Sequence, residues 1–230
     1  MMHKVCFVQL FHISERGGGA EVQANYLSNE LFNRGFNVHY ICRTINPFKI
    51  NTFEEINGVI VHWIPNRPTY LLKNLVLIFN LLNAIDPDYI VERMSSAYGL
   101  PIVLFKSRRS KKYIWICTDN DSPNKYKNIK SSWQRLIFLK FAFSLPVNLF
   151  TDFIRQYAIS NADIIFTQNR IQNELVKRNF KRVSHTMISG HPFPEKQISS
   201  VERYQKKIIL WCGNLGKHKR PELFIQLACE

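Results

Sequence analysis

Apolar runs of strand length alternate with helical patterns along this chain, and this alternation limits the folds that it can adopt. The first runs cover residues 5–10 and 37–42. Between them, apolar residues at steps of four, three and four predict one face of a helix: Ala20, Ala24, Leu27 and Leu31. Gly35 follows that pattern and suits the helix's carboxyl-terminal cap. A strand, a helix and a strand in this order favour two parallel strands joined by a right-handed crossover.

The same alternation continues through the next part of the chain. Strands are predicted at residues 59–63, 89–91, 113–117 and 164–167, and helices at residues 70–82, 99–110 and 169–178. Strands that alternate with helices are typical of α/β proteins with helices on both faces of a parallel sheet. We therefore expect a Rossmann-like, doubly wound parallel sheet.

The composition changes near the carboxyl end. Pro192 and Pro194 stand among glycine, serine and charged residues, which is typical of a linker. An apolar run at residues 208–211, a glycine turn and a helical pattern follow. We expect a first domain at residues 1–188, a linker at 189–205, and at 206–230 the first strand and helix of a second, truncated Rossmann-like domain.

Charge and cysteine content narrow the range of partners and compartments. The formal net charge of +14 predicts an anionic partner: a nucleic acid, an acidic membrane surface or a phosphorylated ligand. The five cysteines are scattered without metal-ligand spacing, which favours reduced thiols and a cytoplasmic location. The amino terminus does not read as a signal peptide, and we expect no membrane-spanning helix.

Three consecutive glycines, Gly17, Gly18 and Gly19, stand between the first strand and its helix. This position is the usual ligand crevice of an open α/β sheet, where glycine lets the backbone approach a ligand and the helix offers N–H groups to an anion. The spacing is neither that of a dinucleotide fold nor that of a P-loop. A tight turn without a ligand is the alternative interpretation.

Three segments together resemble GT-B glycosyltransferases, especially glycosyltransferase family 4. They are GGGAEVQANYLSNELFNRGFNV at residues 17–38, residues 161–165 with Gln168, and WCGNLGKHKRPELFIQLA at residues 211–228. The resemblance implies transfer of a sugar, with retention of configuration, from a nucleotide-sugar donor to a cell-envelope glycan or a lipid-linked acceptor. It also implies two facing domains, no metal and no cofactor besides the donor substrate. We expect this chain alone to be inactive or nearly so.

The resemblance also implies donor-binding residues. Gly18 and Gly19 match the first-domain loop near the donor phosphates, and Gly213 and Lys219 match the entry to the second domain, where the lysine binds the diphosphate. Asn214 stands where the family usually has an arginine. An amide carries no charge, so it stabilises a departing diphosphate less than a guanidinium does.

Other polar residues follow predicted strands. Asp119 or Asp121 matches the place where related enzymes have a cleft residue, and either carboxylate could act as a general base on an acceptor hydroxyl. A shared metal ion, or a plain turn or helix cap, are the alternatives. Arg93 is a candidate contact for phosphate or acceptor. His12 is another such candidate, or else a hydrogen-bonded loop residue.

Residues 125–149 are basic and aromatic, with no acidic residue. They could lie against an anionic membrane surface at the inner face of a membrane, or form a helix that buries its aromatic side chains. Two other functions remain as alternatives. A nucleic-acid-binding module would explain the charge, but its aromatic residues should lie on an exposed sheet rather than in apolar periodic runs. Another Rossmann-like enzyme, using a nicotinamide cofactor, should carry an acidic residue where Cys42 and Arg43 stand.

Overall fold

The computed structural model describes residues 2–67, 70–93, 96–107, 109–135, 138–187 and 221–229. The chain divides into two compact units, Met1–His191 and Pro192–Glu230. In the second unit the structure describes one helix, α7 (Pro221–Cys229), at the place where the sequence predicts a helix. The predicted linker and the predicted strand at residues 208–211 lie outside the described residues, so the predicted domain bounds stay a prediction.

The first unit is built on one eight-stranded sheet. Its order is β3-β4-β2-β1-β5-β6-β7-β8, and each neighbouring pair is parallel except β3 and β4. The strands are β1 (Lys4–Phe11), β2 (Asn37–Thr44), β3 (Phe53–Ile56), β4 (Val59–Pro65), β5 (Tyr89–Glu92), β6 (Lys112–Ile116), β7 (Ile164–Thr167) and β8 (His185–Thr186). The predicted Rossmann-like, doubly wound α/β sheet is confirmed.

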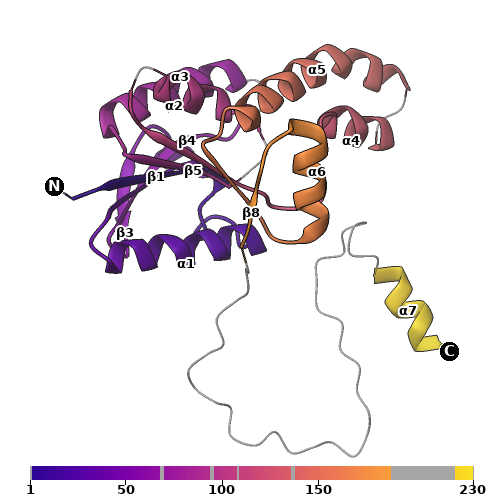
Figure 1. Cartoon of the computed structure of the whole chain (residues 1–230), viewed down its shortest axis with the longest axis horizontal. Coiled ribbons are helices and arrows are strands. Elements are labelled where there is room, and N and C mark those ends of the chain that lie inside the picture. The colour runs from indigo at the N-terminus through magenta and orange to yellow at the C-terminus, as the bar shows by residue number, and fades with distance from the viewer. Residues whose placement is uncertain are drawn as a thin grey trace, which may run out of the picture. The chain divides into compact units, whose positions relative to one another are not determined.

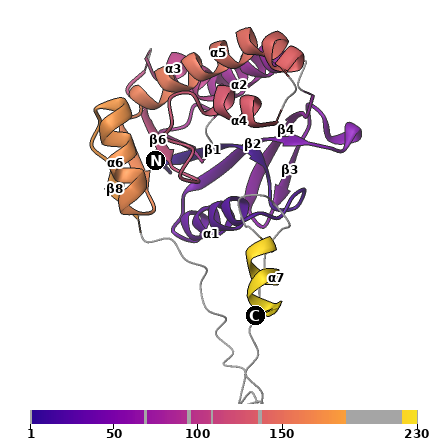
Figure 2. The ribbon, with the colours of Figure 1, turned by 90° about the vertical axis from the view of Figure 1, so that its right-hand side faces the viewer.

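Helices cover both faces of this sheet. Figures 1 and 2 show α1 on one side and α2, α3 and α5 on the other. The helices of this unit are α1 (Gly19–Asn33), α2 (Leu71–Ile85), α3 (Gly99–Lys106), α4 (Lys127–Arg135), α5 (Phe138–Ser160) and α6 (Arg170–Phe180), with a short 3-10 helix at Pro47–Lys49. Among the described helices, none is long and apolar enough to cross a bilayer.

Side chains that alternate along the strands divide the core into two halves. On β1, Val5 and Phe7 belong to the cluster beneath α1, while Cys6 and Val8 belong to the cluster beneath α2, α3 and α5. Both faces of a parallel sheet are therefore dry, as its near-continuous apolar runs require. Each large apolar side chain buried in this way contributes about 1.5–3 kcal/mol.

The turn after α1 explains why the sequence has a glycine there. Gly35 has a φ of 84°, and Phe36 donates its backbone N–H to Leu31. A side chain at a left-handed φ is strained, so glycine ends the helix at little cost. The predicted cap is confirmed, and so is the buried face of α1, where Ala24 has 0% exposure.

Several elements differ from the sequence expectation. The strands β3 and β8 were not predicted, and α3 ends at Lys106 rather than at residue 110. Within residues 125–149, which were left open between two interpretations, the structure describes α4 and the first part of α5, and Pro146 lies inside α5.

Candidate functional site

The order of the strands determines where a ligand can bind at the edge of the sheet. After β1, the chain moves outward through β2 to β4 on one side, and it then returns to β5 and moves outward through β6 and β7 on the other. Ligands of open α/β sheets bind outside the carboxyl ends of the strands at such a switch point. Here the switch point lies between β1 and β5.

A cavity of about 250 Å³ lies at this switch point. We call it the crevice. Five parts of the chain line it: the end of β1, the start of α1, the segment after β5, the segment after β6, and α4. The lining residues are Gln9, Leu10, Ala20, Glu21, Arg93, Ser96, Thr118, Asp119 and Lys127.

Arg93 is the buried cation of the crevice. It follows β5 directly, is 4% exposed, and donates from Nη2 to Gln23 on α1. Gln23 also accepts from Gln168 at 3.3 Å, so one amide joins segments that follow β5 and β7. The Nε atom of Arg93 is buried and has no hydrogen-bond partner among the described residues. A buried donor without a partner is costly, so this guanidinium favours an anionic or oxygen-rich ligand.

Burial lowers the pKa of Arg93, and the carboxylate of Glu21 opposes that shift. Glu21 lies in the first turn of α1. A Cβ placed on Gly18 would come within 2.4 Å of a Glu21 carboxylate oxygen, so the glycine lets this side chain fold back over the start of the helix. Around Gly17 and Gly19, in contrast, the space that a side chain would take is open. The predicted loop residues Gly18 and Gly19 thus lead directly into the lining of the crevice.

Asp119 also lines the crevice, on the segment after β6, the strand next to β5. Its Oδ1 accepts from the backbone N–H of Ser122 at 2.6 Å and from the Ser122 hydroxyl at 2.8 Å. Lys127 lies 3.4 Å from its Oδ2. Burial raises the pKa of Asp119, but Lys127 and the Ser122 hydrogen bonds together hold it below its ordinary value. The carboxylate is therefore ionised at neutral pH, and it combines a turn-forming role with a position on the crevice.

Asp121 has a different environment. Its carboxylate accepts from Asn124 at 3.0 Å, lies 3.8 Å from Lys130, and is 65% exposed. It is not among the described residues that line the crevice. Of the two candidate carboxylates, the structure therefore brings Asp119 to the crevice. No group of three His, Cys, Asp or Glu side chains within the described ranges could hold a metal ion.

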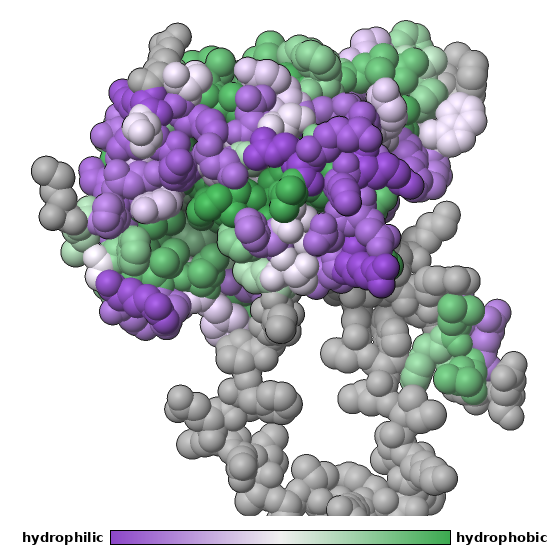
Figure 3. Space-filling model, in the orientation of Figure 1, coloured by the Kyte–Doolittle hydropathy of each residue, from purple (hydrophilic) through white to green (hydrophobic). Residues whose placement is uncertain are grey.

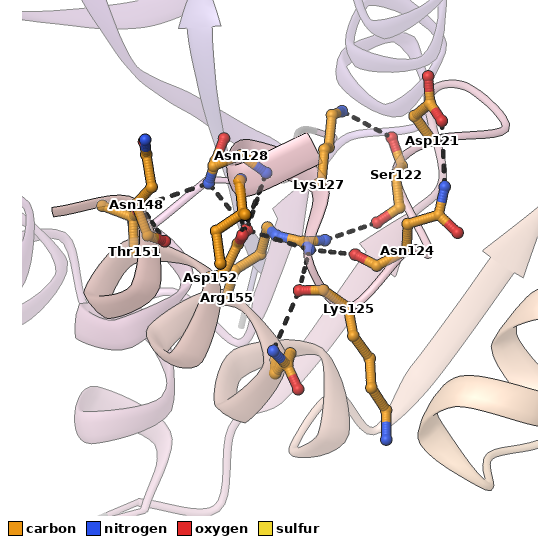
Figure 4. A network of polar contacts seen from close by, with 12 residues as sticks. Asp121, Ser122, Asn124, Lys125, Lys127, Asn128, Asn148, Thr151, Asp152 and Arg155 are labelled. Atoms are coloured by element: carbon orange, nitrogen blue, oxygen red, sulfur yellow. Dashed lines mark hydrogen bonds and ion pairs between the residues drawn. The ribbon is translucent and has the colours of Figure 1, made fainter. Parts of the chain in front are cut away.

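A buried ion pair holds the loop that carries Asp119 (Figure 4). The Arg155 guanidinium donates to the backbone carbonyls of Ser122, at 2.7 Å, and Lys125, at 2.9 Å. Asp152 accepts the backbone N–H groups of Asn128 and Ile129 at 3.1 and 3.2 Å, which caps the start of α4. Arg155 and Asp152 lie 3.4 Å apart, each side chain 1% exposed. This pair on α5 thus fixes both the loop and the helix that carries Lys127.

The other candidate residues lie elsewhere. His12 is 2% exposed, shares a 2.9 Å hydrogen bond with Ser14, and packs edge-on against Tyr40 and Trp63. It is a core residue with a hydrogen-bonded ring rather than part of the crevice lining. Gly213, Asn214 and Lys219 lie outside the described residues, so their predicted roles stay predictions.

The sequence analysis missed several lining residues. Glu21 and Thr118 have a weak signal: an acidic residue in the first turn of a helix, and a hydroxyl next to Asp119. Lys127 has none, because its position depends on Asp152, which caps α4 from 25 residues further along the chain. Gln9 interrupts an apolar strand, which is a usable signal.

The topology and the crevice define a Rossmann-like α/β protein with a candidate ligand site at the carboxyl edge of the sheet. No model of a known protein family matches the sequence, and no curated protein matches it. Sucrose-phosphate synthase from Thermosynechococcus elongatus is similar over 80% of this chain and 47% of its own, with a TM-score of 0.57 and 13% identity. A structure described as a putative UDP-N-acetylglucosamine 2-epimerase from Listeria monocytogenes is similar over 79% of this chain and 43% of its own, with a TM-score of 0.47 and 11% identity.

The first of these likenesses shows the fold, which is a Rossmann-like sheet of the GT-B kind. This chain spans about half the length of each of these two solved structures. Membership of glycosyltransferase family 4 stays a prediction.

Proposed function

We propose that this chain is the acceptor-side part of a GT-B glycosyltransferase, which moves a sugar from a nucleotide-sugar donor to a cell-envelope glycan or a lipid-linked acceptor. The observation that supports this most is the buried guanidinium of Arg93, with its unpaired Nε, at the same crevice as the ionised carboxylate of Asp119. A site that offers both can hold a phosphate or a ring oxygen at the guanidinium and a hydroxyl at the carboxylate.

The size of the crevice is consistent with a site that holds one sugar ring but not the whole nucleotide sugar. Pockets for drug-sized ligands measure roughly 300–1,000 Å³. At about 250 Å³, the crevice has room for about one sugar ring rather than a whole nucleotide sugar. The nucleotide would then be held mainly elsewhere, which agrees with the roles proposed for Gly213, Asn214 and Lys219.

The chemistry of the residues indicates their roles. A carboxylate whose pKa is held low is a good hydrogen-bond acceptor and a weak base. Asp119 would therefore orient a hydroxyl of the donor sugar or of the acceptor, and the donor phosphates would take up much of the reaction's negative charge near Arg93 and the start of α1. We propose transfer with retention of configuration and without a metal ion, as the family resemblance implies.

The first prediction concerns binding to the crevice. We expect the chain to bind nucleoside diphosphate sugars, and Arg93→Gln and Asp119→Asn each to weaken that binding at least tenfold, about 1.4 kcal/mol, because each removes a charged contact. Isothermal titration with a panel of uridine and guanosine diphosphate sugars measures this. Asp121→Asn is the matched control, since this carboxylate lies two residues from Asp119 in the sequence and outside the crevice lining. The affinity of this variant for the nucleotide sugars should not change.

Two further measurements separate the alternatives. The chain alone should give no repeated turnover in a sugar-transfer assay, and steady multiple turnovers would contradict its assignment as one part of a two-part site. Tight oligonucleotide binding that falls steeply with salt, without binding of any nucleotide sugar, would replace the proposal with a nucleic-acid-binding function.

A further inference from the structure

One face of α5 is apolar and exposed. Phe143, Val147, Phe150, Phe153 and Tyr157 follow one another at steps of four, three, three and four, which keeps them on one side of the helix. Phe143 is 84% exposed and Phe153 is 69% exposed. Single exposed apolar residues are ordinary on a protein surface, whereas a contiguous row marks a surface that binds something. We call these five residues the α5 stripe.

The other side of α5 is already used by the core. Ile154, Ala158 and Ile159 are buried against the sheet and α3. These buried residues form the face of α5 that packs on the core, and the α5 stripe is a second apolar face, which is exposed. The sequence alone does not separate these two faces, because both consist of the same residue types.

The α5 stripe contains no charged side chain. Between residues 140 and 160, the charged residues are Lys140, Asp152 and Arg155. Asp152 and Arg155 are each 1% exposed and form the buried pair that holds the neighbouring loop. Transfer of the stripe out of water therefore requires no charged group to be desolvated, which is the main cost of placing a helix in an apolar medium.

The apolar surface continues over the neighbouring helices. α3 packs against both α2 and α5, and green spheres gather along the upper edge of this unit over these helices in Figure 3. Between α2 and α3 lies an apolar groove of about 410 Å³. It is lined by Leu72, Leu75, Val76, Phe79, Leu100, Pro101 and Leu104. Leu72 and Val76 are mostly exposed.

Lysine side chains and a tryptophan lie next to this apolar surface. On α4, Lys130 is 60% exposed, and Trp133 is exposed and packs edge-on against Phe141 of α5 with 5.1 Å between the ring centres. Lys140 is exposed near the start of α5, and Lys73 lies beside Leu72 on α2. Apolar rows next to lysines and a tryptophan are the composition of helices that lie in a bilayer interface.

We propose that the outer surface of α2, α3 and α5 docks onto a lipid bilayer that contains anionic lipids, with the α5 stripe in the interfacial plane. Charge complementarity favours this occupant, because the chain has 31 basic and 17 acidic residues and α4 carries no acidic residue. A second copy of the chain is disfavoured, since a two-fold interface would place the same lysines close to one another. The proposal does not depend on the proposed sugar transfer.

The test uses sedimentation of the chain with two kinds of vesicle, one of phosphatidylcholine alone and one with about a third phosphatidylglycerol. We expect binding to the anionic vesicles, and at least a tenfold loss of affinity in the double variant Phe150→Ser with Phe153→Ser. Phe48→Ser is the matched control, because Phe48 is 91% exposed on the short 3-10 helix and belongs neither to the α5 stripe nor to the lining of the groove. Its binding should match that of the unaltered chain.

The contribution of the lysines to vesicle binding is measured separately. Lys130→Gln and Lys140→Gln should each weaken binding about fivefold, and added salt should weaken it further. Circular dichroism and thermal melting check that all variants fold. No binding to the anionic vesicles, or unchanged binding by the double variant, would overturn the proposal. A dimer of the unaltered chain that becomes a monomer in the double variant would instead assign the surface to a second copy.

Discussion

Glu92 is a buried carboxylic acid one position before Arg93. It is 1% exposed, and the Tyr113 hydroxyl donates a hydrogen bond to it. Burial raises the pKa of Glu92 to about 8, although Tyr113, Ser96 and Arg155 act in the opposite direction. The group is therefore mostly neutral at pH 7, which is how the core holds a carboxyl group so close to the crevice.

This raised pKa predicts a pH dependence of stability. The folded state keeps the Glu92 proton up to about pH 8, while the unfolded chain releases it near pH 4.5. Between these values the folded state binds more protons, so this residue makes stability fall as pH rises. The loss is on the order of 3 kcal/mol from about pH 4.5 to pH 7.

Urea unfolding across this pH range measures the effect. The variant Glu92→Gln keeps the shape of the side chain without a titrating group, so its stability should fall less steeply with pH. Glu55→Gln, at an exposed position on β3, is the control and should follow the unaltered chain. Equal slopes for all three proteins would contradict the raised pKa.

At the scale of elements, the β3–β4 hairpin shows how a local signal can specify a strand pair. Asn57 and Gly58 have φ values of 52° and 78°, which are the left-handed values that a two-residue hairpin turn needs. The Phe32 ring of α1 lies over the turn, 2.2 Å from where a Gly58 side chain would begin. The backbone therefore favours glycine there, and the contact with Phe32 adds a smaller contribution.

We expect Gly58→Ala to destabilise the first unit by about 2 kcal/mol, mainly because alanine is strained at this φ. The Phe32 ring is half exposed and can turn away, so it adds less. The urea midpoint measures this loss. Gly17→Ala is the control, since it has open space and no left-handed φ; a similar loss at both glycines would contradict the explanation.

The elements differ in how far the sequence predicts them. The sequence pattern predicts the strands from β1 to β7 except β3, and the helices α1, α2, α3 and α6, whereas α4 and α5 were left open or not predicted. The signal for β3 is the Asn57–Gly58 pair rather than a long apolar run. β8 is two residues long, below what any pattern can specify. The boundary between α4 and α5 was not predictable, because apolar and basic residues surround both helices and Pro146 argues against a continuous helix.

The site is less predictable than the fold for a physical reason. Arg93 and Asp119 follow strands, and the edge of a parallel sheet brings such positions together. The choice between Asp119 and Asp121 depends on a single turn, and that turn is set by Arg155, more than 30 residues away along the chain. Contacts of this kind leave no local pattern in the sequence.

At the scale of the whole molecule, the crevice belongs to one unit, and its lining extends from Gln9 to Lys127. The sucrose-phosphate synthase that shares the fold is about twice as long as the matched region. In the proposed function, the crevice would hold one sugar ring, and transfer would need a second set of contacts to the donor nucleotide.

Three of the five cysteines, Cys6, Cys42 and Cys117, are completely buried in the sheet of the first unit or at its edge. Burial raises the pKa of all three, that of Cys117 to about 12, so at neutral pH the folded chain offers no thiolate at these positions. Alkylating reagents need a thiolate. Iodoacetamide should therefore leave these three thiols unmodified until the sheet opens, and mass spectrometry of their peptides would then follow unfolding of this unit separately from the rest of the chain.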